Sequence, residues 1–343
     1  MPLEQTRLNF APKSSHRPPR KMPPPSSRRL QLREVAAETI EILPDILAQL
    51  PNFDATASSI HSLKDTTPLD PKDCPGFTLP SDDEKAGQKG TRIRILDQDT
   101  FDVALELQPD TTVNAITQST TTPPTTATNE DAAGPISTPT KPLKTVALLN
   151  LASEIHPGGG FKNGALAQEE CLCYRSSLSL SLHPTYYPIP TLSALYSPNV
   201  LLIRTAMSSG HTLLDSTNPS TTLPVTSVIS VAGLRHPDTK DGEFAMEGQR
   251  NTTKKKIRIS LRVAARQGHT KLVLGALGCG VFANPPGDVA RCFLEVLRED
   301  EFQGGWWEGV VFAVLDNARG DKGGTNGSGN FGMFYRALQS EIV

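Results

Sequence analysis

Two glycine-rich segments carry the first sign of chemistry. Each follows an apolar run and precedes a helix-forming stretch, with GGG at residues 158–160 and GCG at residues 278–280. Glycine lets the backbone approach a ligand closely and direct its N–H groups at it. A helix that begins behind such a loop adds partial positive charge. Two such loops at the carboxyl ends of strands favour a bound diphosphate.

Neither segment has a known nucleotide-binding fingerprint. Residues 158–164 give G-x-G-x-x-x-G instead of G-x-G-x-x-G, and no acidic residue ends a second strand about 20 residues later. The sequence G-x-x-x-x-G-K-[ST] of a P-loop is absent. A turn with a purely structural role explains either glycine loop when it is taken alone.

A triplet of polar residues, Gln168-Glu169-Glu170, lies close behind the first glycine loop. Adjacent helix residues point about 100° apart, so the two carboxylates serve different roles, and one faces the ligand while the other faces a neighbour. An acidic first helical turn has a simpler explanation, because the helix dipole stabilises it. The flanking residues 165–167 and 171–172 are apolar, however, and a carboxyl group in such surroundings acquires a raised pKa suited to a general acid.

The elements that must position these residues follow from hydrophobic periodicity. Residues 32–43 predict an amphipathic helix, and Pro44 ends it or starts the next short helix. Residues 55–90 are polar and predict a loop. Strands are expected over residues 91–96, 146–150, 199–204, 225–232, 271–277 and 310–315, and helices over 164–182, 254–267, 287–297 and 330–341. Unbroken apolar strands between helices indicate an α/β fold of three layers, a mixed sheet with helices on both faces.

Charge and composition set the domain limits. The chain has 343 residues and a net charge of −2, yet residues 1–33 carry eight Lys/Arg and one Glu. We expect residues 1–31 to be a disordered basic tail, residues 32–90 a helical N-terminal extension and loop, and residues 91–343 the catalytic domain. The Thr/Pro-rich segment 117–141 is expected to be a disordered insertion in that domain. The basic tail is either a solvated tail or an arm that contacts nucleic acid or directs nuclear import, and the sequence leaves both open.

Several classes are excluded at this stage. No apolar run approaches the length of a membrane span, and the N-terminus lacks the apolar core of a secretory signal, so we expect a nuclear and/or cytoplasmic protein. Five cysteines do not form a disulfide framework, and the lone C-x-C of Cys171 and Cys173 has no second pair for zinc, so no metal is expected. We expect a solvated helix start at Lys254–Lys256 and packing of Trp306-Trp307 against the sheet.

The segment GGGFKNGALAQEECLC resembles the GGG-x(6–8)-QEE signature of the poly(ADP-ribose) glycohydrolases, in particular those of the shorter microbial type. The segments VALLNLASEIHPGGG, VISVAGLRHPD, LVLGALGCGVFANPPGDVA, VVFAVLD and REVAAETIEIL are similar to that family as well. The resemblance covers roughly residues 32–54 and 91–338, except for the insertion.

The resemblance implies a macrodomain-like core that binds ADP-ribose and needs no cofactor. By resemblance, Glu170 is the catalytic acid and Glu169 its neighbour that contacts the ribose. The substrate-binding residues that the resemblance implies are Asn150, Ser153, Gly158, Gly159, Gly160, Gln168, Gly278, Cys279, Gly280, Val281 and Phe282, with Phe282 against the terminal ribose.

The expected activity is hydrolysis of the ribose–ribose O-glycosidic bonds of poly(ADP-ribose), with Glu170 as general acid and base. The expected partners are ADP-ribose, its polymer and ADP-ribosylated proteins. Three alternatives stay open: hydrolysis of mono-ADP-ribosyl linkages, binding of ADP-ribose without catalysis, and generic nucleotide binding by an α/β protein.

Overall fold

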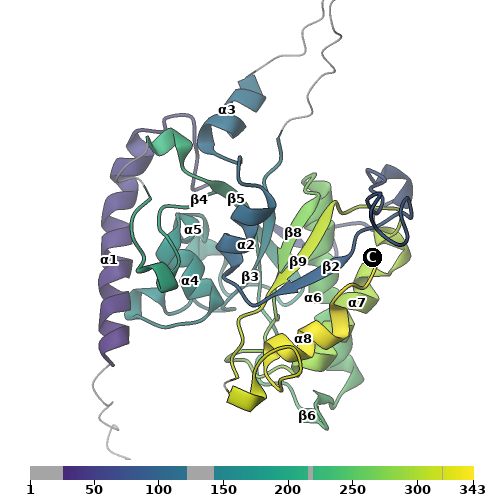
Figure 1. The fold of residues 1–343 in the computed structure, drawn as a ribbon. Coiled ribbons are helices and arrows are strands. Elements are labelled where there is room, and N and C mark those ends of the chain that lie inside the picture. The colour runs from purple at the N-terminus through teal and green to yellow at the C-terminus, as the bar shows by residue number, and fades with distance from the viewer. Residues whose placement is uncertain (1–25, 122–142, 215–218, 319) are drawn as a thin grey trace, which may run out of the picture.

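The computed structural model describes residues 26–121, 143–214, 219–318 and 320–343 (Figure 1). The helices are α1 (Ser27–Ala48), α2 (Thr100–Leu107), α3 (Val113–Thr121), α4 (Gln168–Arg175), α5 (Leu178–Ser181), α6 (Glu247–Arg266), α7 (Pro286–Leu297) and α8 (Asn330–Leu338). The strands are β1 (Ser59–Ser62), β2 (Ile93–Leu96), β3 (Ala147–Leu151), β4 (Ser193–Leu201), β5 (Val225–Val231), β6 (Thr239–Lys240), β7 (Glu243–Phe244), β8 (Lys271–Leu274) and β9 (Gly309–Ala313).

Seven strands form one mixed sheet in the order β1-β4-β5-β3-β8-β9-β2. Strand β4 is antiparallel to both β1 and β5, whereas β5, β3, β8, β9 and β2 run parallel to one another. A parallel strand needs a crossover to reach the next one, and the helices supply these connections. The loops that follow the five parallel strands therefore all emerge at one edge of the sheet.

Helices cover both faces of this sheet (Figure 1). Successive side chains of a strand point to opposite faces, so Leu149 of β3 packs in the apolar cluster that contains α6, α7 and α8. Its neighbour Leu148 packs in the opposite cluster, which contains residues of α1, α2, α4 and α5. The predicted fold class, a mixed sheet between two helical layers, is confirmed.

Helix α1 is longer than the sequence indicated. It begins at Ser27, so the expected disorder of residues 27–31 is wrong, because Ser26 caps the helix by accepting a hydrogen bond from the Arg29 N–H at 3.3 Å. Pro44 lies inside the helix instead of ending it. This proline faces solvent, while Leu43 and Ile46 beside it are buried and hold the helix on the core.

The predicted helix 164–182 is two helices. Gly164 has a left-handed φ of +72°, and α4 begins only at Gln168. The helix ends before Ser176, whose hydroxyl donates to the Leu172 carbonyl at 2.7 Å and accepts from the Leu178 N–H at 3.2 Å. A serine that bonds to nearby backbone in this way competes with the helical hydrogen bonds.

Other boundaries also differ from expectation. The loop predicted over 55–90 contains β1, an edge strand of the main sheet, and β4 begins at Ser193, earlier than the expected 199. Residues 117–121 of the expected insertion are the end of α3. The remainder of that insertion and residues 1–25 of the expected tail lie outside the described residues. The domain boundary at residues 90 and 91 stays a prediction.

Two predictions about exposed or buried side chains have opposite outcomes. Trp306 and Trp307 are buried in the cluster that contains α6, α7 and α8, as expected. The expected solvation of Lys254–Lys256 is wrong for Lys256, which is only 5% exposed and donates to the Thr191 carbonyl at 2.5 Å. Helix α6 begins at Glu247, so this lysine lies on an inward-facing turn and not at a helix start. Within the described ranges, no helix is long and apolar enough to span a membrane.

Candidate active site

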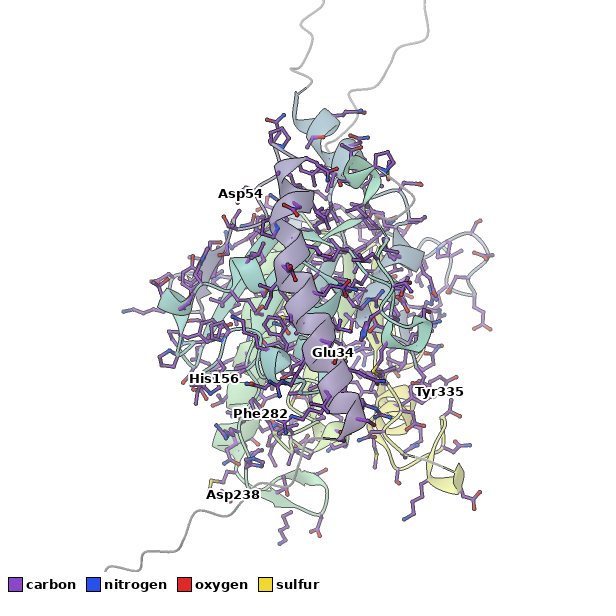
Figure 2. The ribbon with its side chains drawn as sticks, turned by 90° about the vertical axis from the view of Figure 1, so that its left-hand side faces the viewer. Glu34, Asp54, His156, Asp238, Phe282 and Tyr335 are labelled. Carbon is purple, nitrogen blue, oxygen red and sulfur yellow. The ribbon has the colours of Figure 1, made fainter. Side chains whose placement is uncertain are left out.

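The two glycine loops lie at the same edge of the sheet. They follow β3 and β8, which are adjacent and parallel, so both emerge at the carboxyl ends. In the view of Figure 2, His156 of the first loop and Phe282 of the second both appear at the level of the lower half of α1. The first turn of α4 packs against the first loop, and it brings the Gln168-Glu169-Glu170 triplet there.

Glu170 is held by the first glycine loop. Its Oε1 accepts a hydrogen bond from the Gly160 N–H at 2.8 Å, and the side chain is buried. No described residue donates a hydrogen bond to its Oε2. Gly159 has a φ of +60°, and a Cβ there would lie 2.4 Å from Glu170 Oε1. The loop therefore needs glycine at this position both for its backbone conformation and for the approach of the carboxylate.

Glu169 points to other partners, as the 100° step along a helix requires. Its Oε2 accepts from the Ser153 N–H at 2.7 Å, and its Oε1 accepts from Asn150 Nδ2 at 3.3 Å. Burial raises the pKa of the Glu169 carboxyl group to about 8, more than these hydrogen bonds lower it. The two adjacent glutamates thus differ in partners, as the sequence predicted.

Asn150 and Ser153 complete the contacts around Glu169. Asn150 is fully buried at the end of β3, and its Nδ2 also donates to Ser230 Oγ of β5 at 3.0 Å. Within the described part of the chain, Asn150 Oδ1 has no hydrogen-bond partner. The Ser153 hydroxyl accepts from the N–H groups of Ile155 and His156 at 3.3 and 3.1 Å, and so fixes the start of the loop.

Gln168 has a positional role in this structure. Its Oε1 accepts from the Leu151 N–H at 2.9 Å, and its Nε2 donates to the Leu149 carbonyl at 2.9 Å. The Nε2 also lies 3.4 Å from Thr100 Oγ1 at the start of α2. The side-chain amide continues the hydrogen-bonding edge of β3 as a neighbouring strand would, and this contact fixes the rotation of α4 on the sheet.

Gly158 is also confined by its neighbours. It has a φ of +70°, and a Cβ there would lie 3.0 Å from both Cys173 Sγ and Phe161 Cδ1. Thus Gly158, Gly159 and Gly160 are brought together with both glutamates, Asn150 and Ser153.

The second loop is tightly packed where it begins and exposed to solvent at its tip. Gly278 has a φ of +73°, and a Cβ there would lie 2.5 Å from Asn284 Nδ2. Cys279 is buried, and this burial raises the pKa of its thiol. At the tip, a Cβ on Gly280 would meet no atom within 4 Å, and Val281 is 74% exposed.

The Phe282 ring is half-buried beside this tip. Its backbone carbonyl accepts a hydrogen bond from the His236 N–H at 2.9 Å, which ties the second loop to the segment after β5. Among the described residues, no group of three or more His, Cys, Asp or Glu side chains could hold a metal ion.

Comparison with known proteins shows that the chain is similar to poly(ADP-ribose) glycohydrolases (PARG). The family model of the microbial-type PARG catalytic domain matches residues 56–205, which include the first glycine loop and the QEE triplet. The match covers 150 of the 343 residues, and this part of the chain is similar to the microbial-type PARG catalytic domain. None of the curated proteins matches the sequence.

Solved PARG structures are similar over most of the chain. Poly(ADP-ribose) glycohydrolase (PARG) from Thermomonospora curvata has a TM-score of 0.61 and 25% identity, over 90% of this chain and 99% of that one. A second structure of that protein holds the inhibitor ADP-HPD and matches equally well. PARG from Deinococcus radiodurans in complex with ADP-ribose has a TM-score of 0.56 and 26% identity, over 86% of this chain and 97% of that one. These matches cover more of the chain than the family model does, and they support the predicted macrodomain-like fold.

Asn284 is a residue of the candidate site whose role the sequence did not reveal. Its buried Nδ2 lies 2.6 Å from the Leu234 carbonyl, 3.0 Å from the Gly278 carbonyl and 3.3 Å from the Phe282 carbonyl. One side chain therefore joins the second glycine loop to the segment after β5. The asparagine stands directly before Pro285 and Pro286, and polar residues at such positions commonly fix turns, which was the only available signal.

Proposed function

We propose that this protein hydrolyses the ribose–ribose O-glycosidic bonds of poly(ADP-ribose) and releases ADP-ribose, with Glu170 as the catalytic residue. The observation that carries the proposal is the buried Glu170 carboxylate, held by the Gly160 N–H at the edge where both glycine loops emerge. The family-model match and the similar PARG structures support the same activity.

The glycine loops suit the diphosphate of the terminal ADP-ribose unit. Residues 158–160 and 278–282 supply backbone at the carboxyl ends of two adjacent strands. A diphosphate there is stabilised by N–H groups and leaves its ribose next to the QEE triplet. Asn150 and Glu169 are suited to contact the hydroxyl groups of that ribose, and Phe282 is suited to pack against the sugar. ADP-ribose is the ligand of the Deinococcus radiodurans relative, and we extend this ligand to the present chain.

Glu170 then acts twice. No described residue donates a hydrogen bond to its Oε2. This oxygen donates a proton to the leaving oxygen of the neighbouring ribose, and the bond between that oxygen and the anomeric carbon breaks. The sugar passes through an oxocarbenium-like state, which the bound diphosphate stabilises. A water molecule then attacks the anomeric carbon, and the Glu170 carboxylate accepts its proton. The products are free ADP-ribose and a polymer shortened by one unit.

The test compares release of ADP-ribose from the polymer by the wild type and by Glu170→Gln. We expect the variant to lose about 10²–10⁴-fold in kcat, the usual contribution of general acid–base catalysis, and to keep its affinity for ADP-ribose in calorimetry. Glu106→Gln on the exposed side of α2 is the matched control and should cleave normally. Equal rates for wild type and Glu170→Gln would contradict the proposal, and cleavage of only a mono-ADP-ribosylated protein would change the substrate.

The natural substrates are, in this proposal, polymers attached to ADP-ribosylated proteins in the nucleus and/or cytoplasm. The excess of positive charge in residues 1–33 supports nuclear import or contact with nucleic acid. Microscopy of a fluorescent fusion, with and without neutral replacements of Arg17, Arg20 and Lys21, tests this part. An unchanged distribution would remove the import role.

A further inference from the structure

Four cationic side chains gather where the start of α1 lies against the segment after the first glycine loop. They are Arg28, Arg29 and Arg33 of α1 and Lys162 of the 3-10 turn Phe161–Asn163, and all four are exposed. We call these four residues the basic ledge. The N-terminal end of α1 lies at the same edge of the molecule as the loops after the parallel strands (Figure 1).

The ledge is fixed to the loop by direct contacts. Arg29 Nε donates a hydrogen bond to the Asn163 carbonyl at 2.9 Å. Gly164 is covered by the two arginine stems, since a Cβ there would lie 2.9 Å from Arg29 Cγ and 3.0 Å from Arg33 Cγ. The Lys162 ammonium group lies 6.0 Å from the centre of the Phe161 ring. These contacts hold the stems of Arg29 and Arg33 against the loop, and Arg28 precedes Arg29 on the same helix.

Within the described ranges of the chain, no carboxylate neutralises the charges of the ledge. None of the four side chains forms an ion pair with another residue that the structure describes. By contrast, Arg250 and Arg258 of α6 and Arg298 directly after α7 each form an ion pair with a glutamate. A group of unpaired cations beside a phosphate-binding loop creates a positive potential that attracts a further anion.

The same short segment, residues 160–165, connects the basic ledge with the proposed catalytic glutamate, Glu170. The Gly160 N–H that holds Glu170 lies only two residues before Lys162. The Tyr174 hydroxyl of α4 lies 3.1 Å from the Phe161 carbonyl and 2.6 Å from the Ala165 carbonyl, and so fixes the segment between them. On the other side of Tyr174, its carbonyl accepts a hydrogen bond from Thr39 Oγ1 of α1 at 3.0 Å. The distance from Glu170 to the ledge is therefore set by packing and not by a free loop.

We propose that the basic ledge binds the diphosphate of the ADP-ribose unit on the leaving side of the cleaved bond. This inference rests on the proposed function, in which the glycine loops hold the diphosphate of the terminal unit. The next unit then begins beyond Glu170, next to the segment that carries the ledge. Each diphosphate carries two negative charges, and guanidinium groups bind phosphate oxygens through paired N–H donors. The ledge consequently selects a polymer over a single ADP-ribosyl group.

The test removes charge from the ledge without disturbing its anchor. The variant Arg28→Gln/Arg33→Gln/Lys162→Gln keeps Arg29 and its bond to Asn163. We expect kcat/KM for the polymer to fall about tenfold or more, through KM, because charge-assisted hydrogen bonds are lost. Hydrolysis of an ADP-ribosyl group linked to an uncharged phenol should change less than about twofold, because that substrate has no second diphosphate. The slope of log KM against log salt concentration should fall by about two.

A matched control separates a local site from general attraction. Lys64→Gln/Lys72→Gln/Lys89→Gln removes the same charge from exposed lysines that precede β2. This variant should keep the KM of the wild type for the polymer, and equal losses in both triple variants would overturn the ledge as a site. If the wild type does not cleave the polymer, the proposed function fails. If the wild type cleaves the polymer, and the ledge variant has the same KM and salt dependence as the wild type, only the ledge proposal fails.

Nucleic acid is the other polyanion that the ledge could meet. A single-stranded RNA with the same number of phosphates is therefore added as a competitor. We expect the polymer to bind the wild type more tightly than this RNA does, and the ledge variant to lose that preference. Loss of RNA binding with an unchanged KM for the polymer would assign the ledge to nucleic acid and overturn the proposal.

Discussion

Replacing Gly159 by alanine tests the geometry on which the proposed chemistry depends. The residue has a φ of +60°, and a Cβ there would lie 2.4 Å from Glu170 Oε1 and 3.0 Å from Glu169 Oε2. Non-bonded heavy atoms prefer separations of about 3.5 Å, so the Glu170 carboxylate must retreat by about 1 Å. A displacement of about that size is enough to lower the rate of a positioned catalytic group about 100-fold.

The stability of Gly159→Ala should change much less than its activity. A left-handed φ costs an alanine roughly 1–2 kcal/mol. The clash adds little to this, because Glu170 Oε1 is the far end of a flexible side chain. Gly210→Ala is a matched control, since Gly210 has a φ of +81° and a Cβ there would meet no atom within 4 Å. We expect both variants to lose similar free energy of unfolding in urea, and only Gly159→Ala to lose activity.

The assay measures ADP-ribose release from saturating polymer by both variants, at a temperature where both are folded. We expect about a 100-fold lower kcat for Gly159→Ala and normal turnover for Gly210→Ala. Two results would refute this reasoning. One is a Gly159→Ala variant with turnover within about twofold of wild type. The other is an equal loss of turnover in both variants, which would assign the effect to backbone strain in general.

Two further predictions concern Glu169 and Asn284. Burial raises the pKa of Glu169 to about 8. Between pH 4.5 and 8 the unfolded chain therefore releases this proton while the folded chain keeps it, and the stability of the folded chain falls as pH rises. Glu169→Gln removes that cost, and its unfolding free energy relative to wild type should rise by up to about 5 kcal/mol over this range; a difference that stays constant with pH would contradict the role of burial. Asn284→Ala removes the side-chain donor of the Leu234 carbonyl, while the Gly278 and Phe282 carbonyls keep backbone donors, so we expect a loss of about 1–3 kcal/mol and a higher KM for the polymer. Asn199→Ala loses one bond to the Asp54 carbonyl and should leave that KM unchanged.

The parts of the fold that the sequence predicted well are those decided by local pattern. Strands β3, β5, β8 and β9 are covered on both faces, so their residues form continuous apolar runs that can be recognised without a partner. Strand β1 has the sequence Ser-Ile-His-Ser and none of its residues is buried, so its pairing with β4 leaves no comparable pattern. Its position depends on an edge of the sheet that only the folded chain provides.

In the candidate site, too, the sequence predicted the local features and missed those that depend on contacts between distant residues. The glycine loops and the QEE triplet are contiguous in sequence, so their spacing could be interpreted directly. The role of Asn284 could not, because its Nδ2 reaches the Leu234 carbonyl 50 residues away. The hydrogen bond between Gln168 and Thr100 likewise spans 68 residues. A resemblance assigned Gln168 to the substrate, whereas the structure shows both ends of its amide bonded to the backbone of β3.

The order of the QEE triplet follows from the way α4 begins on the sheet. Gln168 fixes the rotation of the helix against β3, and each following residue is turned by about 100°. The first such step directs Glu169 to Ser153 and Asn150, and the second directs Glu170 to Gly160. Exchanging the first two residues of the triplet would place a carboxylate against the Leu149 carbonyl, which cannot donate to it. The helix would then lose the contact that fixes its rotation, and with it the separate positions of the two glutamates. The glutamine is therefore as necessary to the proposed acid as the glycine loop that holds it.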